Sequence, residues 1–112
     1  MFENVKVLNR SADDQFEVYQ LLNDDCVGIS ELPHGTVISG IYLAALYESN
    51  ERQYLKFRNA ESIYITTSKT FIDSFLSAWQ LLGELVAVKV VKKRSLKTNR
   101  EFATCVAVDY RK

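Results

Sequence analysis

The sequence predicts a mainly β domain with one helix, following an acidic N-terminal extension. From residue 36 onward, short runs rich in Val, Ile, Tyr and Phe recur, and several alternate apolar with polar side chains as half-buried strands do. A different run, after residue 68, repeats its apolar residues at three- and four-residue spacings, which is the period of a helix. The chain has 112 residues and is 47% apolar, which is enough for one hydrophobic core.

Three strands are expected to follow one another between residues 36 and 66. Residues 36–47 form a long β-rich run with Gly40 inside it, where a bulge or a sharp bend is easiest. Residues 54–58 and 62–66 alternate, and polar turn residues separate the three runs. In these two shorter strands the side chains expected to face the core are Leu55, Phe57, Ile63 and Ile65.

A helix and two more strands complete the predicted domain. The helix begins after Thr67 or Ser68, either of which can cap it, and runs to about Leu82. Residues 85–94 alternate inward-facing valines with outward-facing side chains, which indicates a strand. The charged connection 95–100 then leads to a last strand at residues 102–110.

This order of elements is β-β-β-α-β-β, which is the chain order of an OB-fold, a five-stranded Greek-key barrel. In that barrel the helix plugs one open end, which accounts for the wide apolar face of the predicted helix. Other five-stranded β proteins with one helix fit the same order. The sequence therefore predicts an OB-fold-like domain at residues 32–112.

Residues 1–31 form the predicted extension, set off by a Pro-His-Gly turn at residues 33–35. Residues 2–8 fit a strand, and residues 11–14 resemble a helix start. Residues 16–20 alternate as a strand does, so both a helix and a strand remain open there.

Charge divides the chain into an acidic and a basic half. Residues 1–51 carry nine acidic against two basic side chains, a net charge of −7. Residues 52–112 carry five acidic against twelve basic ones, a net charge of +7, which indicates a polyanionic partner. The acidic segment has three alternatives: it is inert, it packs near a binding groove and mimics phosphates, or it recruits a basic protein.

No catalytic, metal or cofactor pattern stands out in the chain. Its one histidine, His34, lies in a turn and its carboxylates are dispersed, so an enzyme is not expected. Cys26 and Cys105 lie far apart without CxxC spacing, and both are expected to be reduced thiols. Lacking a signal segment and an apolar run of about 20 residues, the protein is expected in the cytoplasm, outside any membrane.

The expected solvent face of the strands combines aromatic rings with cations. Single-stranded nucleic acid needs flat rings on which its bases stack and cations that hold its phosphates. The same composition also suits an ordinary sheet surface, since tyrosine favours strands and Lys and Arg keep a sheet soluble. The residues expected to share this face are Tyr42, Tyr54, Lys56, Arg58 and Tyr64.

A second cationic feature lies in the fourth strand and the hairpin after it, where six bases fall within twelve residues. In an OB-fold this hairpin borders the usual binding groove, so a basic arm there holds the nucleic-acid backbone in a salt-sensitive way. A solvated hairpin tip is the alternative. The six bases are Lys89, Lys92, Lys93, Arg94, Lys97 and Arg100.

The segments GTVISG at 35–40, YITTSKTF at 64–71 and LVAVKVVKKR at 85–94 resemble small OB-fold single-stranded-DNA-binding proteins of bacteriophages. The likeness covers roughly residues 33–110 and concerns the order and character of the elements. It implies sequence-independent coating of exposed strands in phage DNA replication or recombination, in the host cytoplasm. The chain lacks the long glycine-rich tail with an acidic tip of bacterial single-strand-binding proteins, so recruitment of replication enzymes through such a tail is not implied.

Two functions therefore stand side by side. The leading one is binding of single-stranded DNA, with RNA not distinguished from it by the sequence. The alternative is a non-enzymatic protein-interaction module, such as a phage-encoded inhibitor or assembly factor, that uses the acidic N-terminal half. Either function fits a homo-oligomer such as a dimer, because a sheet edge or the N-terminal segment can pair between copies.

Overall fold

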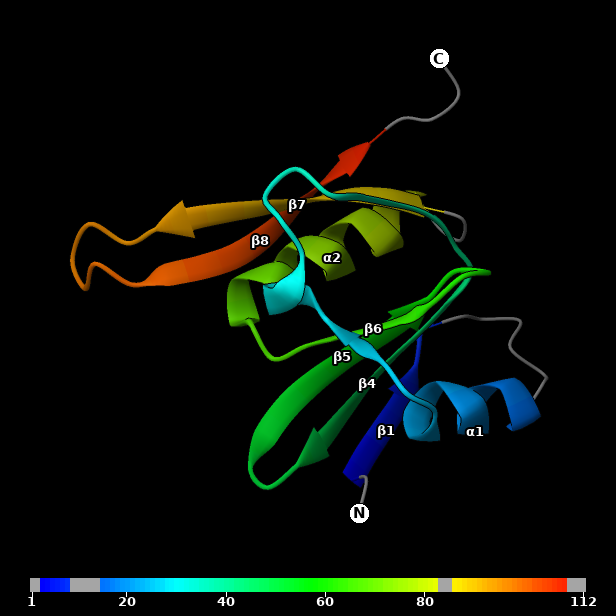
Figure 1. Ribbon diagram of the computed structural model, residues 1–112. Helices are drawn as coiled ribbons and strands as arrows, with labels where there is room; N and C mark the ends of the chain where they lie inside the picture. Colours follow the sequence, from blue (N-terminus) through cyan, green and yellow to red (C-terminus); the bar gives the residue numbers. More distant parts are fainter. Residues whose placement is uncertain (1–2, 9–14, 83–85, 109–112) are drawn as a thin grey trace.

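The computed structural model describes residues 3–8, 15–82 and 86–108, which fold into two sheets with a helix lying between them (Figure 1). The elements are β1 Glu3–Val7, α1 Gln15–Asn23, β2 Val27–Gly28, the 3-10 helix η1 Ile29–Glu31, β3 Val37–Ile41, β4 Leu43–Ser49, β5 Arg52–Arg58, β6 Ile63–Thr66, α2 Lys69–Leu82, β7 Val86–Arg94 and β8 Glu101–Val108. The larger sheet has the order β1-β4-β5-β6-β2 and the smaller one the order β3-β7-β8. The predicted strand ends at residues 85 and 109–110 lie outside the described residues.

One run of the chain passes from the smaller sheet into the larger one. β3 pairs with β7 and β4 pairs with β5, and only Tyr42 separates β3 from β4. The register of β3 shifts between Ile38 and Ile41, and Gly40 there has a φ of 68°, in the left-handed region open to glycine. The bend predicted at Gly40 is confirmed, and it lets one run join both sheets.

The main core lies between the two sheets and is built around α2. Phe71 and Phe75 of α2 stack on Phe57 of β5, with ring centroids 6.1 and 4.7 Å away. Val88 and Val90 of β7 reach the same core and are fully buried, as are the three phenylalanines. Each side chain buried in this way contributes about 1.5–3 kcal/mol, so these contacts hold the sheets together.

The described strands do not close into a barrel. At the edge of β8 one carbonyl, that of Ala103, is instead bonded by the start of α2, where Ser68 Oγ and Thr70 Oγ1 each donate to it at 2.7 Å. The mainly β class is confirmed. The expected five-stranded barrel with one helix is corrected to two sheets and two α-helices, because these hydroxyls take the place of a closing strand.

The N-terminal segment supplies two strands of the larger sheet. β1 pairs with β4 and β2 pairs with β6, so both outer strands of this sheet come from residues 3–28. Leu21 of α1 and Ile29 of η1 are 0% and 1% exposed. The helix alternative is confirmed for Gln15–Asn23 and the strand alternative for residues 16–20 is wrong. Neither of the described helices is long and apolar enough to cross a membrane.

Candidate nucleic-acid interface

The side of β5 that was expected to face solvent is covered by α1. Tyr54, Lys56 and Arg58 do share one side of the strand, as their alternation predicts. Helix α1 packs over this side and closes a second, smaller core beneath it. That second core consists of Leu21, Leu43, Ala45 and Ile63.

Among the three residues on this side of β5, Lys56 is the one that lies buried. It is only 5% exposed, and its ammonium donates to the Leu22 carbonyl of α1 at 2.7 Å. The same ammonium lies 6.0 Å from the centre of the Tyr47 ring, which is a cation–π distance. Burial lowers the pKa of Lys56, while nearby Cys26 and Asp24 act against that shift. The prediction that Lys56 faces solvent is therefore wrong: its hydrogen bond holds α1 against β5.

Tyr54 and Arg58 are half-buried towards opposite ends of this side of β5. Tyr54 stacks on Tyr47, with ring centroids 5.0 Å apart and 5° between the planes. The Arg58 guanidinium lies 5.6 Å from the centre of the Tyr42 ring. Tyr42 and Arg58 are thus brought together as predicted, but their rings and cations already contact one another within the chain.

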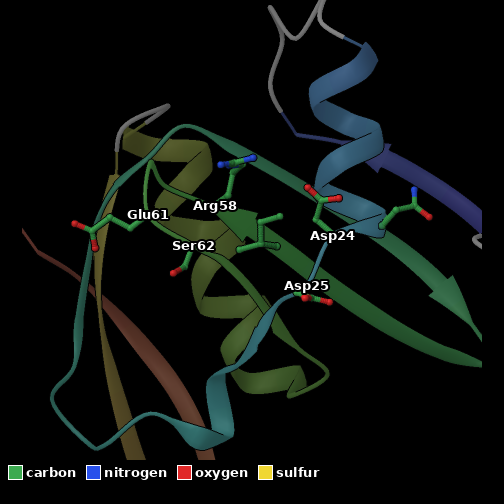
Figure 2. Close-up of a pocket in the computed structure, with 7 residues that line it drawn as sticks. Asp24, Asp25, Arg58, Glu61 and Ser62 are labelled. Carbon is green, nitrogen blue, oxygen red and sulfur yellow. The ribbon is translucent and has the colours of Figure 1, made fainter.

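An open pocket of about 490 Å³ lies between the end of α1 and the turn that joins β5 to β6 (Figure 2). We call it the acidic pocket, because three carboxylates and one guanidinium line it. Negative charge disfavours a phosphate there, so Arg58 is poorly placed to hold a nucleic-acid backbone. The lining residues are Asn23, Asp24, Asp25, Arg58, Glu61, Ser62 and Ile63.

Tyr64 lies on the other side of the sheet, against the main core. Its ladder partner is Phe57, and the two rings stack with centroids 5.5 Å apart. Ile63, which was expected in the main core, instead pairs with Arg58 and joins the second core. The prediction that Tyr64 shares a stacking surface with Tyr54 is therefore wrong.

The turn between β5 and β6 explains this reversal. Four residues, 59–62, separate the paired Arg58 and Ile63, so odd-numbered residues of β6 lie beside even-numbered residues of β5. The Asn59 side-chain oxygen accepts the backbone N–H groups of Glu61 and Ser62 at 3.0 Å each, which fixes the turn. Because side chains alternate with period two, this one-residue offset places every residue of β6 on the unexpected side.

We expect Tyr64→Ala to lower the free energy of unfolding by about 2–3 kcal/mol, because it removes a ring packed on Phe57 and the main core. Urea unfolding measures the change. Tyr19→Ala is the matched control, since Tyr19 is 60% exposed and its loss should cost less than about 0.5 kcal/mol. Equal costs for the two substitutions would contradict the placement of Tyr64.

The β7–β8 hairpin projects beyond the body of the molecule (Figure 1). Lys89 and Lys93 lie on the outer side of β7, and their ladder partners on β8 are Val106 and Phe102. As predicted, this side of the strand faces outward at both lysines. The hairpin bases left exposed are Lys89, Lys93, Arg94, Lys97 and Arg100.

Lys92 differs from the other five bases. Its ammonium donates to the Ser30 carbonyl at 3.0 Å and lies 3.8 Å from a carboxylate oxygen of Glu101. Its backbone N–H donates to Nδ1 of His34 at 3.0 Å, which gives the turn histidine a structural contact. Lys92 thus ties β7 to the segment around η1 and is less available to a ligand than its neighbours.

A basic pocket that the sequence did not reveal lies at the start of α2. Arg52 comes from the turn end of β5 and Lys69 from the first turn of α2, where no acidic residue accompanies it. Single bases beside turns carry no sequence signal of their own, and only folding brings these two together. The pocket encloses about 420 Å³ and is lined by Arg52, Gln53, Thr67, Lys69 and Ile72.

The basic pocket adjoins the hairpin. Lys69 stands between Ser68 and Thr70, whose hydroxyls both bond to the Ala103 carbonyl of β8. Ala103 is the ladder partner of Lys92, so Lys69 lies beside the middle of the hairpin. Lys69 of the pocket therefore lies near the hairpin that carries the other five exposed cations, although Lys89 and Lys93 are on the side of β7 that faces away from α2.

Chemically, this region offers exposed cations and a few half-buried rings. The part of the chain that the structure describes holds no group of three or more His, Cys, Asp or Glu side chains placed for a metal ion. Comparison with models of known families, with curated proteins and with solved structures found no match for this chain.

Proposed function

We propose that the protein binds single-stranded nucleic acid, and DNA first of all, without sequence preference. The observation that carries this proposal is the run of exposed cations on the projecting hairpin, continued by Arg52 and Lys69 at the basic pocket. Cations arranged along a track hold successive phosphates and release the counterions of the nucleic acid. We call these seven residues the basic track: Arg52, Lys69, Lys89, Lys93, Arg94, Lys97 and Arg100.

Rings near the basic track favour a single strand over a duplex. Phe102 is half-buried beside Lys93, its ladder partner, and Tyr54 is half-buried at the end of β5 that leads to Arg52. Unpaired bases stack on such rings, and each stacked base contributes about 1–3 kcal/mol. A duplex keeps its bases stacked inside and gains only the phosphate contacts.

The fold that we propose for residues 37–108 is an opened OB-fold. The bent run β3–β4, the β5 and β6 strands, α2 and the β7–β8 hairpin follow the chain order of that fold. In it, the hairpins β4–β5 and β7–β8 border the binding groove, and the basic track draws residues from both of these hairpins. With this fold, the setting that we propose is phage DNA replication or recombination.

Fluorescence anisotropy with a labelled oligothymidine, across a salt series, tests the proposal. Lys89→Glu with Lys93→Glu should remove two phosphate contacts and lower the slope of log K against log salt by about 1.4. At about 0.1 M salt, this corresponds to roughly 25-fold weaker binding. Arg52→Glu with Lys69→Glu should have a similar effect, because the basic pocket belongs to the same track.

Lys6→Glu is the matched control, since Lys6 is an exposed base on β1 at the far edge of the larger sheet. It should change affinity far less than either double substitution. The proposal fails if the unsubstituted chain does not bind the oligothymidine at low salt. It also fails if duplex DNA of equal length binds as tightly, or if Lys6→Glu weakens binding as much as the track variants do.

The alternative proposal, a protein-interaction module using the acidic half, has one observation of its own. Phe16 and Tyr19 are 66% and 60% exposed on the outer side of α1, close in the chain to Asp24 and Asp25. This alternative predicts no measurable affinity for oligonucleotides, so the same titration separates the two functions.

A further inference from the structure

The outer side of α1 presents aromatic rings next to negative charge. Phe16 and Tyr19 stack on one another, with centroids 6.3 Å apart, and both are well exposed. Asn23 continues the same side of the helix, since its amide donates to the Tyr19 carbonyl one turn back, and it lines the acidic pocket. Rings and carboxylates therefore form one surface, which we call the α1 surface.

The tip of the β7–β8 hairpin has the complementary composition. Leu96 is 102% exposed, the highest value among the exposed large apolar side chains of the described residues. Lys97 follows it directly, Arg100 lies at the other end of the same turn, and both are exposed as well. A single exposed leucine is ordinary on a protein surface, so it is the cations near it that suit this tip to an acidic surface.

The hairpin tip and the α1 surface cannot meet within one molecule. In Figure 1 the hairpin extends to the left, while α1 lies at the lower right, on the other side of the larger sheet. Two copies placed in a row bring the tip of one against the α1 surface of the next. The net charges of −7 and +7 on the two halves of the chain favour this arrangement over one that pairs like halves.

We infer that copies of this chain associate head to tail, with the hairpin tip of one copy docked on the α1 surface of the next. Leu96 packs against Tyr19, and Lys97 and Arg100 face the acidic pocket with its three carboxylates. Such an interface uses two different surfaces and does not close on itself, so it builds open rows of molecules. Lys97 and Arg100 also belong to the basic track, so the tip serves one of the two contacts at a time, and the association is tested without nucleic acid.

Sedimentation velocity without nucleic acid, over a range of protein concentrations at low salt, tests the inference. Tyr19→Lys places a cation opposite the basic tip, and Leu96→Asp removes the apolar contact with Tyr19 and places an acid beside the acidic pocket. Each variant alone should raise the dissociation constant of association by at least about tenfold. Mixing the two in equal amounts should restore pairs of molecules, because the intact tip of the Tyr19→Lys chain can dock on the intact α1 surface of the Leu96→Asp chain.

Both substitutions are at exposed positions, and urea unfolding should show each variant within about 0.5 kcal/mol of the unsubstituted chain. A monomeric unsubstituted chain at the highest concentration would overturn the inference and leave the α1 surface to a different, basic partner. Association of either variant at the original strength would overturn it, as would a mixture that stays monomeric. Since these measurements contain no nucleic acid, they fail or succeed separately from the oligothymidine titration.

Discussion

A chain shortened to residues 32–112 is expected to lose its cooperative fold, although it retains every strand from β3 to β8 and the helix α2. The truncation removes β1 and β2, the neighbours of β4 and β6, together with buried Leu21 and Ile29. Losing each of these two side chains costs about 2–5 kcal/mol, before the lost strand pairs are counted. The total reaches the roughly 5–15 kcal/mol that holds a typical domain folded.

Fluorescence of Trp79, the single tryptophan, in a urea titration measures this loss. Trp79 is 7% exposed, and its indole N–H donates to the Leu8 carbonyl, which the truncation also removes. Leu21→Ala in the full chain is the control: it should lower the free energy of unfolding by about 2–5 kcal/mol while unfolding stays cooperative. A shortened chain with a cooperative transition near the original midpoint would contradict the prediction.

Deleting the acidic segment does not isolate its function. Because the segment supplies strands and core residues, its deletion would abolish a protein contact and nucleic-acid binding alike. Point substitutions on the outer side of α1, such as Tyr19→Lys, leave Leu21 and Lys56 in place and separate the two functions.

The sequence predicted the strands from residue 36 onward well, because alternation and composition act locally. Leu55 and Phe57 were expected in the core, and both are 0% exposed. Ile65, by contrast, pairs with Lys56 on the α1 side of the sheet. Strand β6 has buried or half-buried residues on both sides, so its alternation does not say which side faces the main core. The length of the turn before β6 decides which side faces the main core, and the alternation alone predicted the opposite register.

The site was predictable where exposure depends on a single hairpin and unpredictable where distant segments meet. Lys89 and Lys93 are exposed because they lie on the outer side of β7, and the bases at 94, 97 and 100 because they lie at the end of the projecting hairpin. Lys56 looks the same in the sequence, yet a helix about 35 residues earlier covers it, and the Leu22 carbonyl accepts a hydrogen bond from its ammonium. Arg52 and Lys69 likewise become one pocket only through the packing of α2 against the larger sheet.

The stability of the protein is expected to fall above pH 9 through the buried thiol of Cys105, which is 4% exposed. Burial raises the pKa of Cys105 from 9.0 to about 12. Between pH 9 and pH 12 the thiol is neutral in the folded chain but ionised in the unfolded one. Ionisation therefore stabilises the unfolded state relative to the folded state. A difference of three pKa units corresponds to about 4 kcal/mol of the free energy of unfolding. This stability is fully present below pH 9 and is lost as the pH approaches 12.

Cys105→Ala isolates this contribution from the other groups that titrate at alkaline pH. Burial also raises the pKa of Tyr47 and lowers that of Lys56, but both residues are present in the two chains and their effects cancel in the difference. At neutral pH the alanine chain should be less stable by about 1 kcal/mol, since it loses a small buried side chain. Near pH 11 the order should reverse, because the unsubstituted chain has by then lost about 2.7 kcal/mol. Parallel urea midpoints at both pH values would show that the thiol ionises as readily in the folded chain as in the unfolded one.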